Sequence, residues 1–276
     1  MITTVHPQAT AWLGLEGRVC VVTGGGSGIG EETARQLAQA GAAVAVLDRD
    51  ESAACRVAAE IAATGALAIG IAADVSLASE VTAAAAKVRA ELGACQVLVN
   101  NAAARKPGAL LDMPLEQWNQ VLSVNLTGAL ICTQAFGQQM VNAGRGGSII
   151  HVASIVGEHP LPNGGAYSAS KAGMMMLART LAVELAAHRI RSNVVCPGLV
   201  RTPFSEDAYQ APDLLRQRED MIPAGRVSSP LDLANAIVFL ASDRSSYVNG
   251  QELHVDGGLR QTLMSQVPRA GKSLPR

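Results

Sequence analysis

The chain has 276 residues, of which 49% are hydrophobic and 16% charged, with a formal net charge of -1 and an isoelectric point near 6.5. This length is enough for one large α/β domain with a substantial buried core. The balanced charge excludes the basic surface that nucleic acid or an anionic membrane would require, so we expect a small molecule as the partner.

The cysteines and the N-terminal sequence favour a cytoplasmic location. The cysteines are odd in number, scattered and never in a C-x-x-C arrangement, which is typical of reduced structural thiols. They are Cys20, Cys55, Cys95, Cys132 and Cys196. No signal peptide is recognisable, and no apolar run approaches the roughly 20 residues of a spanning helix. We therefore expect a cytoplasmic protein with no membrane partner.

The first recognisable unit is a strand, a glycine-rich turn and a helix. Residues 1–16 show no periodicity and are interpreted as a loosely held N-terminal arm, whereas residues 18–23 form a short β-branched run typical of a buried strand. Glycines at 24–30 and a helical pattern at 31–40 follow. This order predicts a loop that binds a diphosphate at a helix start, although such a cluster also occurs as a plain turn.

The second strand ends in an acidic residue that bears on the choice of cofactor. Residues 43–47 form a buried strand, and Asp48 follows it, 18 residues beyond Gly30. A carboxylate here can accept hydrogen bonds from the adenosine ribose and repels a 2'-phosphate, which favours NAD over NADP. Arg49 could contact a phosphate, but only beside this opposing carboxylate.

Strands and helices then alternate along the chain. The pattern predicts helices at 51–63 and 77–92 and strands at 67–73 and 97–99, an alternation typical of parallel βαβ units. Asp74 and Val75 follow one of these strands, and Asn100 and Asn101 follow the other. Amides at a strand's carboxyl end can point into the ligand crevice of an open sheet, or simply end the strand.

A third group of polar residues has the outline of an acid/base site. Tyr167 and Lys171 are four positions apart, so on a helix they share one face. A nearby ammonium group can lower a tyrosine pKa, and a shift from about 10 to about 7 requires about 4 kcal/mol. Ser154 follows the strand-like residues 147–152. Alone, the pair could be an ordinary helix surface pair and the serine a turn residue.

These motifs together resemble the short-chain dehydrogenase/reductase family. Thr23-Gly24-x-x-x-Gly28-x-Gly30, Asn100-Asn101-Ala102, Ser154, Tyr167-x-x-x-Lys171 and Pro197-Gly198 occur in one order at consistent spacings. The likeness implies a single doubly wound Rossmann-type domain over residues 17–259, with a seven-stranded parallel sheet flanked by helices. Residues 260–276 would form a C-terminal tail.

The resemblance also implies the catalytic roles. Tyr167 would be the general acid/base, Lys171 would hold the nicotinamide ribose and lower the tyrosine pKa, and Ser154 would orient the substrate oxygen. Asn125 matches the family asparagine that supports a water relay behind the lysine. No metal site is expected.

The cofactor positions are implied in the same way. They are Gly24, Ser27, Gly28, Ile29, Gly30, Asp48, Arg49, Asp74, Val75, Asn101, Tyr167, Lys171, Pro197, Gly198, Val200 and Thr202. Many NADPH-dependent relatives carry a basic residue in the glycine turn where this chain has Ser27, and this difference also favours NAD. Relatives usually have glycine at the position of Ala103, so the crevice is expected to be slightly narrower here.

The substrate side is less specified. Residues 199–227, punctuated by prolines, are interpreted as a mobile lid or as a solvated helix pair covering an edge. Phe204 and Tyr209 could close over an apolar or cyclic substrate, and Glu158 and His159 could line its pocket.

Three functions remain open from the sequence. The first is an NAD-dependent dehydrogenase of a secondary alcohol, such as a cyclic alcohol, polyol or sugar. The second is a 3-oxoacyl-thioester reductase, against which Asp48 argues, and the third is a non-catalytic dinucleotide sensor, against which the complete catalytic set argues. Relatives are commonly dimers or tetramers, so a homo-oligomer is expected. The apolar run Met174-Met175-Met176-Leu177 is compatible with such an interface and equally with ordinary core packing.

Overall fold

A seven-stranded parallel sheet forms the centre of the protein, whose residues 12–263 are described by a computed structural model. The strands are β1 (Val19–Thr23), β2 (Ala43–Asp48), β3 (Ala68–Ala72), β4 (Val97–Asn100), β5 (Gly147–Val152), β6 (Ile190–Pro197) and β7 (Glu252–Val255). They lie in the order β3-β2-β1-β4-β5-β6-β7, and every neighbouring pair is parallel. The predicted doubly wound sheet is thus confirmed.

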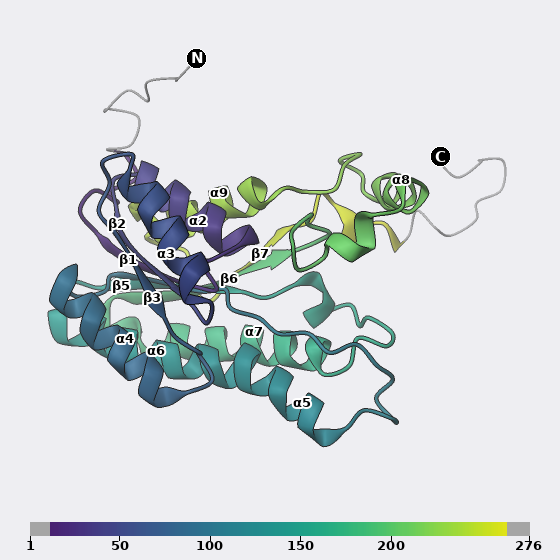
Figure 1. The fold of residues 1–276 in the computed structure, drawn as a ribbon, viewed down its shortest axis with the longest axis horizontal. Coiled ribbons are helices and arrows are strands. Elements are labelled where there is room, and N and C mark those ends of the chain that lie inside the picture. Colours follow the sequence, from purple (N-terminus) through teal and green to yellow (C-terminus); the bar gives the residue numbers. More distant parts are fainter. Residues whose placement is uncertain (1–11, 264–276) are drawn as a thin grey trace, which may run out of the picture.

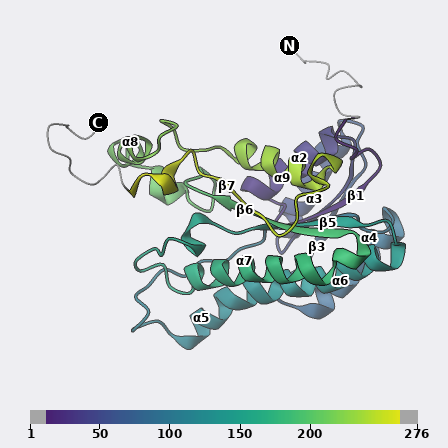
Figure 2. The same ribbon diagram turned by 180° about the vertical axis from the view of Figure 1, so that it is seen from behind.

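Helices cover both faces of this sheet (Figures 1 and 2). One face carries α2 (Gly28–Gln39), α3 (Glu51–Ala62) and α9 (Pro230–Ala241). The other carries α4 (Ala78–Glu91), α5 (Leu115–Leu122), α6 (Gly128–Ala143) and α7 (Tyr167–Glu184). A further helix, α8 (Pro212–Met221), belongs to the segment after β6. Each face therefore has its own apolar core.

The burial of each strand follows its place in the sheet. Every residue of β1 and β4 is buried, because helices cover both of their faces. The edge strands β3 and β7 are mostly half-buried and carry glycine or charged residues. Continuous apolar runs therefore mark the central strands, and the edge strands have a weaker signal.

The strand order places a crevice at the carboxyl edge of the sheet. The chain first winds outward from β1 to β3 and then returns to continue from β4 to β7 on the other side. The two windings diverge between β1 and β4, where open α/β sheets bind their ligands. The segments that follow β1 and β4 begin with Gly24 and Asn101, which consequently lie side by side.

The described part of the expected N-terminal arm packs on the domain. Leu15 is completely buried in the core beneath α2 and α9, and the backbone N–H of Asp243 donates to the carbonyl of Leu13 at 3.0 Å. Arg244 also lies over the Trp12 ring, 5.1 Å from its centroid. Packing therefore begins before the expected boundary at residue 17. Residues 1–11 and 264–276 lie outside the described residues, which leaves most of the expected C-terminal tail undescribed.

The methionine run on α7 mostly packs inside the chain. Met174 and Met175 are buried in a small core between α7 and the sheet, and Leu181, further along the helix, is buried as well. Met176 is 56% exposed and Val183 is 79% exposed. Core packing accounts for most of the run, and the homo-oligomer stays a prediction.

The described residues also bear on the cysteines and on the membrane. All five cysteines are free, and all except Cys55 are buried. Burial raises the pKa of Cys20, Cys132 and Cys196 to about 12, so these thiols stay protonated at neutral pH. Across residues 12–263, no helix combines the length and the apolar character needed to cross a membrane. The cytoplasmic location stays a prediction.

The packed N-terminal segment can be tested by truncating Leu15. We expect Leu15→Ala to lower the free energy of unfolding by about 2–5 kcal/mol in urea denaturation, because it leaves a cavity in the core. Leu111→Ala is the matched control, since Leu111 is fully exposed and its loss should change stability by less than about 0.5 kcal/mol. Equal effects of the two substitutions would contradict the packing described for residues 12–16.

Candidate active site

The glycine turn after β1 brings the backbone unusually close to the end of β4. Gly24 has φ +61°, and a Cβ at this position would lie 2.8 Å from the Cα of Ala102. At Gly30 a Cβ would lie 2.1 Å from the Gly24 carbonyl oxygen, so only glycine fits there. Helix α2 begins at Gly28, inside the glycine cluster and three residues earlier than predicted. Its N-cap residue Ser27 makes no side-chain capping hydrogen bond. The Ser27 side chain therefore does not compete with a diphosphate for the N–H groups of the first turn.

Asn101 supports this turn from the neighbouring strand. Its Nδ2 donates to the carbonyl oxygens of Thr23 at 3.0 Å and Gly24 at 2.9 Å. The Thr23 hydroxyl in turn accepts from the backbone N–H of Asn101 at 3.1 Å. The side chain expected beside the cofactor ribose therefore also holds the cofactor turn in shape.

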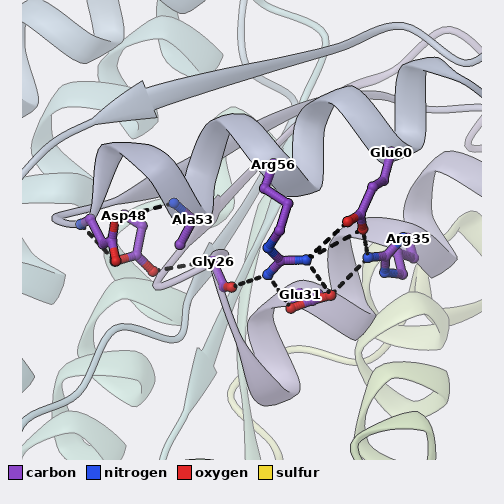
Figure 3. A network of polar contacts seen from close by, with 8 residues as sticks. Gly26, Glu31, Arg35, Asp48, Ala53, Arg56 and Glu60 are labelled. Carbon is purple, nitrogen blue, oxygen red and sulfur yellow. Dashed lines mark hydrogen bonds and ion pairs between the residues drawn. The ribbon is translucent and has the colours of Figure 1, made fainter.

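Asp48 braces the same turn from the other side. Its Oδ2 accepts from the Gly26 N–H at 2.9 Å, and its Oδ1 accepts from the Asp50 N–H at 3.1 Å (Figure 3). The carboxylate stays half-buried at the end of β2. The expected ribose acid is thus fixed next to the glycine turn, whereas Arg49 is exposed.

An ion-pair network beneath the turn is a feature that the sequence analysis missed. Arg56 on α3 donates from Nη2 to the Gly26 carbonyl oxygen and to Glu31 Oε2, both at 2.9 Å, and its Nη1 lies 3.2 Å from Glu60 Oε1 (Figure 3). Arg35 bridges the same two glutamates. The i, i+4 spacing of Glu31 with Arg35 and of Arg56 with Glu60 was a signal within each helix. No sequence pattern predicted the contact between α2 and α3.

Asp74 and Val75 lie after β3 at the same edge. Asp74 Oδ1 accepts from the backbone N–H of Ser76 at 2.9 Å and from its hydroxyl at 2.6 Å. Val75 is buried and lines a small hollow with Thr23 and Ala102. Val75 therefore joins the wall of the crevice, and the Asp74 carboxylate holds a local turn.

Lys171 is buried next to Tyr167, the first residue of α7. Its Nζ lies 5.5 Å from the centroid of the Tyr167 ring and donates to the carbonyl oxygen of Val152 at 2.8 Å. Only 1% of Lys171 is exposed, and this burial lowers its pKa to about 8. The predicted helix pair is therefore anchored at the end of β5, two residues before Ser154.

Ser154 begins the loop between β5 and α7. It is the N-cap of the short helix η2 (Ile155–Gly157), and its Oγ accepts from the Val156 N–H at 3.3 Å. Helix η2 packs against α7. This packing brings the start of the loop to the helix that carries Tyr167 and Lys171.

Asn125 links the loop after β4 with helix α7 through its side chain. It lies in the π-turn η1 (Ser123–Thr127) and is fully buried. Its Oδ1 accepts from the Ala104 N–H at 2.7 Å, and its Nδ2 donates to the Ala104 carbonyl oxygen at 3.0 Å and to Ser170 Oγ at 2.9 Å. Ser170 precedes Lys171, so Asn125 connects the loop after β4 with the first turn of α7. Interruptions of this type in a helix are frequent at functional sites.

The Tyr167 phenol has a higher pKa than the sequence predicted. Burial raises its pKa to about 12, and the positive charge that opposes this effect comes from Arg105. The guanidinium carbon of Arg105 lies 5.3 Å from the ring centroid of Phe204, whose ring centroid lies 6.3 Å from that of Tyr167. Burial outweighs the opposing charge of Arg105, and the lowering expected from Lys171 stays a prediction. Arg105 had not been singled out.

The segment after β6 closes over the glycine turn. Pro197 ends β6, and the backbone at Gly198 lies so close to Asp256 that a Cβ would approach it to 2.8 Å. Val200 and Thr202 are both buried, and a Cβ on Gly28 would lie 3.4 Å from the Thr202 side chain. The cofactor positions predicted after β6 thus face those predicted after β1.

Two other lid and loop residues have different surroundings from those expected. Tyr209 is 4% exposed, and the Arg218 guanidinium stacks on its ring at 4.9 Å, so only Phe204 of the two lid aromatics lies near Tyr167. Glu158 Oε2 lies 2.8 Å from Arg260 Nη1 and 3.2 Å from His254 Nε2. Glu158 thus ties the loop after Ser154 to the chain beyond β7. His159 is exposed.

His151 is a buried imidazole on β5, paired with Asn100 of β4. Its Nδ1 lies 3.3 Å from Asn100 Nδ2, and its Nε2 lies 3.4 Å from Ser192 Oγ. Burial and the charge of Lys171 lower the pKa of His151 to about 3. The folded protein therefore keeps this ring neutral at pH values where the unfolded chain protonates it.

This difference predicts a loss of stability in acid. The pKa of His151 is lower in the folded chain than its ordinary 6.5, so the unfolded chain binds an extra proton between pH 6.5 and about 3. The free energy of unfolding should fall as the pH drops through this window, by up to about 1.4 kcal/mol per unit. In urea titrations, His151→Asn should show a shallower fall than the parent. The exposed His159→Asn should show the parental slope, and equal slopes for all three proteins would contradict the account.

Comparisons with known proteins agree with this geometry. Residues 24–260 match the family model described as Enoyl-(Acyl carrier protein) reductase. A 2,5-dichloro-2,5-cyclohexadiene-1,4-diol dehydrogenase of Sphingobium indicum is 36% identical over 244 residues, which cover 88% of this chain and 96% of that protein. A 3-oxoacyl-[acyl-carrier-protein] reductase of Thermotoga maritima is 38% identical over 246 residues, covering 89% and 98%.

Solved structures give the same result. The crystal structure of a gluconate 5-dehydrogenase from Burkholderia cenocepacia, in complex with NADP and tartrate, matches with a TM-score of 0.87 at 34% identity. The match covers 92% of this chain and 99% of that one. The likeness therefore extends over nearly the whole of both proteins.

Proposed function

The chain belongs to the short-chain dehydrogenase/reductase family and is an oxidoreductase, and we propose that it interconverts a secondary alcohol and its ketone with NAD. One observation carries the proposal. The buried Lys171 is anchored at the end of β5 beside Tyr167, at the sheet edge where the glycine turn lies. A proton-transfer pair next to a dinucleotide turn is the arrangement that coupled proton and hydride transfer requires.

The proposed roles follow from these positions. Bound NAD supplies the acceptor for the hydride that the carbinol carbon releases. Tyr167 Oη takes the hydroxyl proton in the same reaction, and Lys171, positively charged below its pKa of about 8, stabilises the phenolate. The Ser154 hydroxyl hydrogen-bonds to the substrate oxygen. In the reverse direction Tyr167 returns the proton. Because burial raises the pKa of Tyr167, oxidation should accelerate as the pH rises toward about 8, above which Lys171 loses the charge that stabilises the phenolate.

The preference for NAD rests on the charges around the glycine turn. The Asp48 carboxylate is fixed at the end of β2 by the Gly26 N–H, where it would repel a 2'-phosphate. The nearby guanidinium of Arg56 is paired with Glu31 and Glu60, so it is not available to a phosphate (Figure 3). The related gluconate 5-dehydrogenase was crystallised with NADP, so the choice is argued from this chain's own residues.

A second candidate is reduction of a 3-oxoacyl thioester. The 38% identity to the reductase of Thermotoga maritima favours it, and the description of the matching family model names an acyl carrier protein, although for reduction of an enoyl group. A strong preference for NADPH would distinguish this reaction from the first, and the Asp48 carboxylate argues against that preference. A dinucleotide sensor without activity is disfavoured because Asn125, Ser154, Tyr167 and Lys171 are all present.

Replacement of Tyr167 tests the chemistry. Tyr167→Phe should lower kcat for NAD-linked oxidation across a panel of secondary alcohols by about 10²- to 10⁴-fold, because the general acid/base is lost. The dissociation constant for NAD, measured by calorimetry, should stay close to the parental value. Tyr209→Phe is the control, since Tyr209 is buried in the lid against Arg218. Parental turnover in Tyr167→Phe would overturn the proposed function.

Replacement of Asp48 tests the cofactor. Asp48→Asn removes the charge and keeps the shape, so the preference for NAD over NADP in kcat/KM should fall by about tenfold or more. Asp50→Asn is the control, because Asp50 lies two residues away, where its carboxylate caps α3. A parent enzyme that already prefers NADP would contradict the assignment.

A further inference from the structure

The loop after β4 holds Arg105 in a fixed place at the mouth of the site. The preceding residue, Ala104, is bound through both its N–H and its carbonyl oxygen by Asn125. Three residues beyond Arg105, the Gly108 N–H donates at 2.8 Å to the carbonyl oxygen of Asn163, in the loop that leads to Tyr167. The backbone is therefore secured on both sides of Arg105.

The side chain of Arg105 reaches the lid aromatic that borders the catalytic tyrosine. Its guanidinium carbon lies 5.3 Å from the Phe204 ring centroid, and the Phe204 and Tyr167 ring centroids are 6.3 Å apart. A guanidinium that stacks on an aromatic face keeps its N–H groups in its own plane, where they remain free to donate. Arg105 is thus held beside the reacting centre with its donors available.

In the part of the chain that the structure describes, Arg105 lacks the carboxylate partner that two arginines of the segment after β6 and one beyond β7 have. Arg201 pairs with Glu206 at 2.8 Å, Arg226 with Asp232 at 2.7 Å and Arg260 with Glu158 at 2.8 Å. Among the side chains that the structure describes, Arg105 has no ion pair and is exposed. Its charge is felt by Tyr167, whose pKa it lowers against the effect of burial. No carboxylate among the described side chains therefore pairs with this positive charge at the mouth of the site.

On the basis of the proposed function, we propose that Arg105 binds a carboxylate of the substrate, which is therefore a short hydroxy acid rather than a neutral alcohol. The planar guanidinium and a carboxylate form two parallel hydrogen bonds, which makes the contact directional as well as strong. Arg105 lies next to the lid aromatic that faces Tyr167, so the carboxylate lies a few bonds from the carbinol carbon. This placement argues against an acyl thioester, because the charges of such a substrate belong to its carrier and lie far from the keto group.

The test compares acids with uncharged partners that react at the same carbon. The full chain is assayed with NAD on short hydroxy acids and on the primary amide of each acid. We expect kcat/KM to favour the acids by about tenfold or more, and Arg105→Gln to abolish that preference by raising KM for the acids while KM for the amides stays at the parental value. Lys106→Gln is the matched control, because Lys106 is an exposed neighbouring cation that makes no stacking contact with Phe204. It should retain the preference for acids.

Three outcomes would overturn the inference. The first is a parent enzyme that uses the amides as well as the acids, and the second is an Arg105→Gln protein that loses both to the same extent. The third is a phosphate monoester that the parent enzyme prefers over every carboxylate.

A binding experiment separates this inference from the proposed function. Tartrate is titrated calorimetrically into Tyr167→Phe with NAD present, and then into the same protein carrying Arg105→Gln. Binding that weakens about tenfold or more in the double variant supports the carboxylate site even if no alcohol is oxidised, which would reject only the proposed function. Oxidation of neutral alcohols with no tartrate binding would reject only the role of Arg105.

Discussion

The site depends on one buried charge, the ammonium group of Lys171. Transfer of an ammonium group out of water is costly, and here the described protein offers it a single carbonyl oxygen, that of Val152. Desolvation accordingly lowers its pKa to about 8. Because this value is still above neutral pH, most Lys171 side chains keep their charge. The same interaction ties the first turns of α7 to the end of β5. The position of Tyr167 therefore follows from how this charge is accommodated.

The cofactor side is built on a different principle, because its parts are mostly backbone. Gly24 and Gly30 bring the main chain close to itself, and Asn101 and Asp48 hold that close approach from the two neighbouring strands. Arg56 adds a third support through the Gly26 carbonyl oxygen. Each of these side chains has a structural partner within the turn. Substitutions there will alter the shape of the turn as well as any contact with a dinucleotide.

Local patterns made much of this architecture predictable from the sequence. The strands β1, β2 and β4 are continuous apolar runs because helices cover both faces, and the glycine spacing and Tyr167-Lys171 pair are short-range motifs. The contacts that escaped prediction join distant segments. Arg56 meets Glu31 across two helices, and Arg105 meets Phe204 across two loops. Such pairs depend on how helices and loops pack in the finished fold, and no periodicity marks them. The raised pKa of Tyr167 escaped for the same reason, since burial is a property of the assembled fold.

The side chain of Asn125 has a consequence beyond the support of the catalytic helix. Its Oδ1 and its Nδ2 both hydrogen-bond to the backbone of Ala104, next to Arg105, and the same Nδ2 donates to Ser170, next to Lys171. The loop at the mouth of the site and the helix that performs the chemistry therefore share one joint. A change in the length or conformation of that loop would be transmitted to the start of α7. The loop after β4 is accordingly not an independent module.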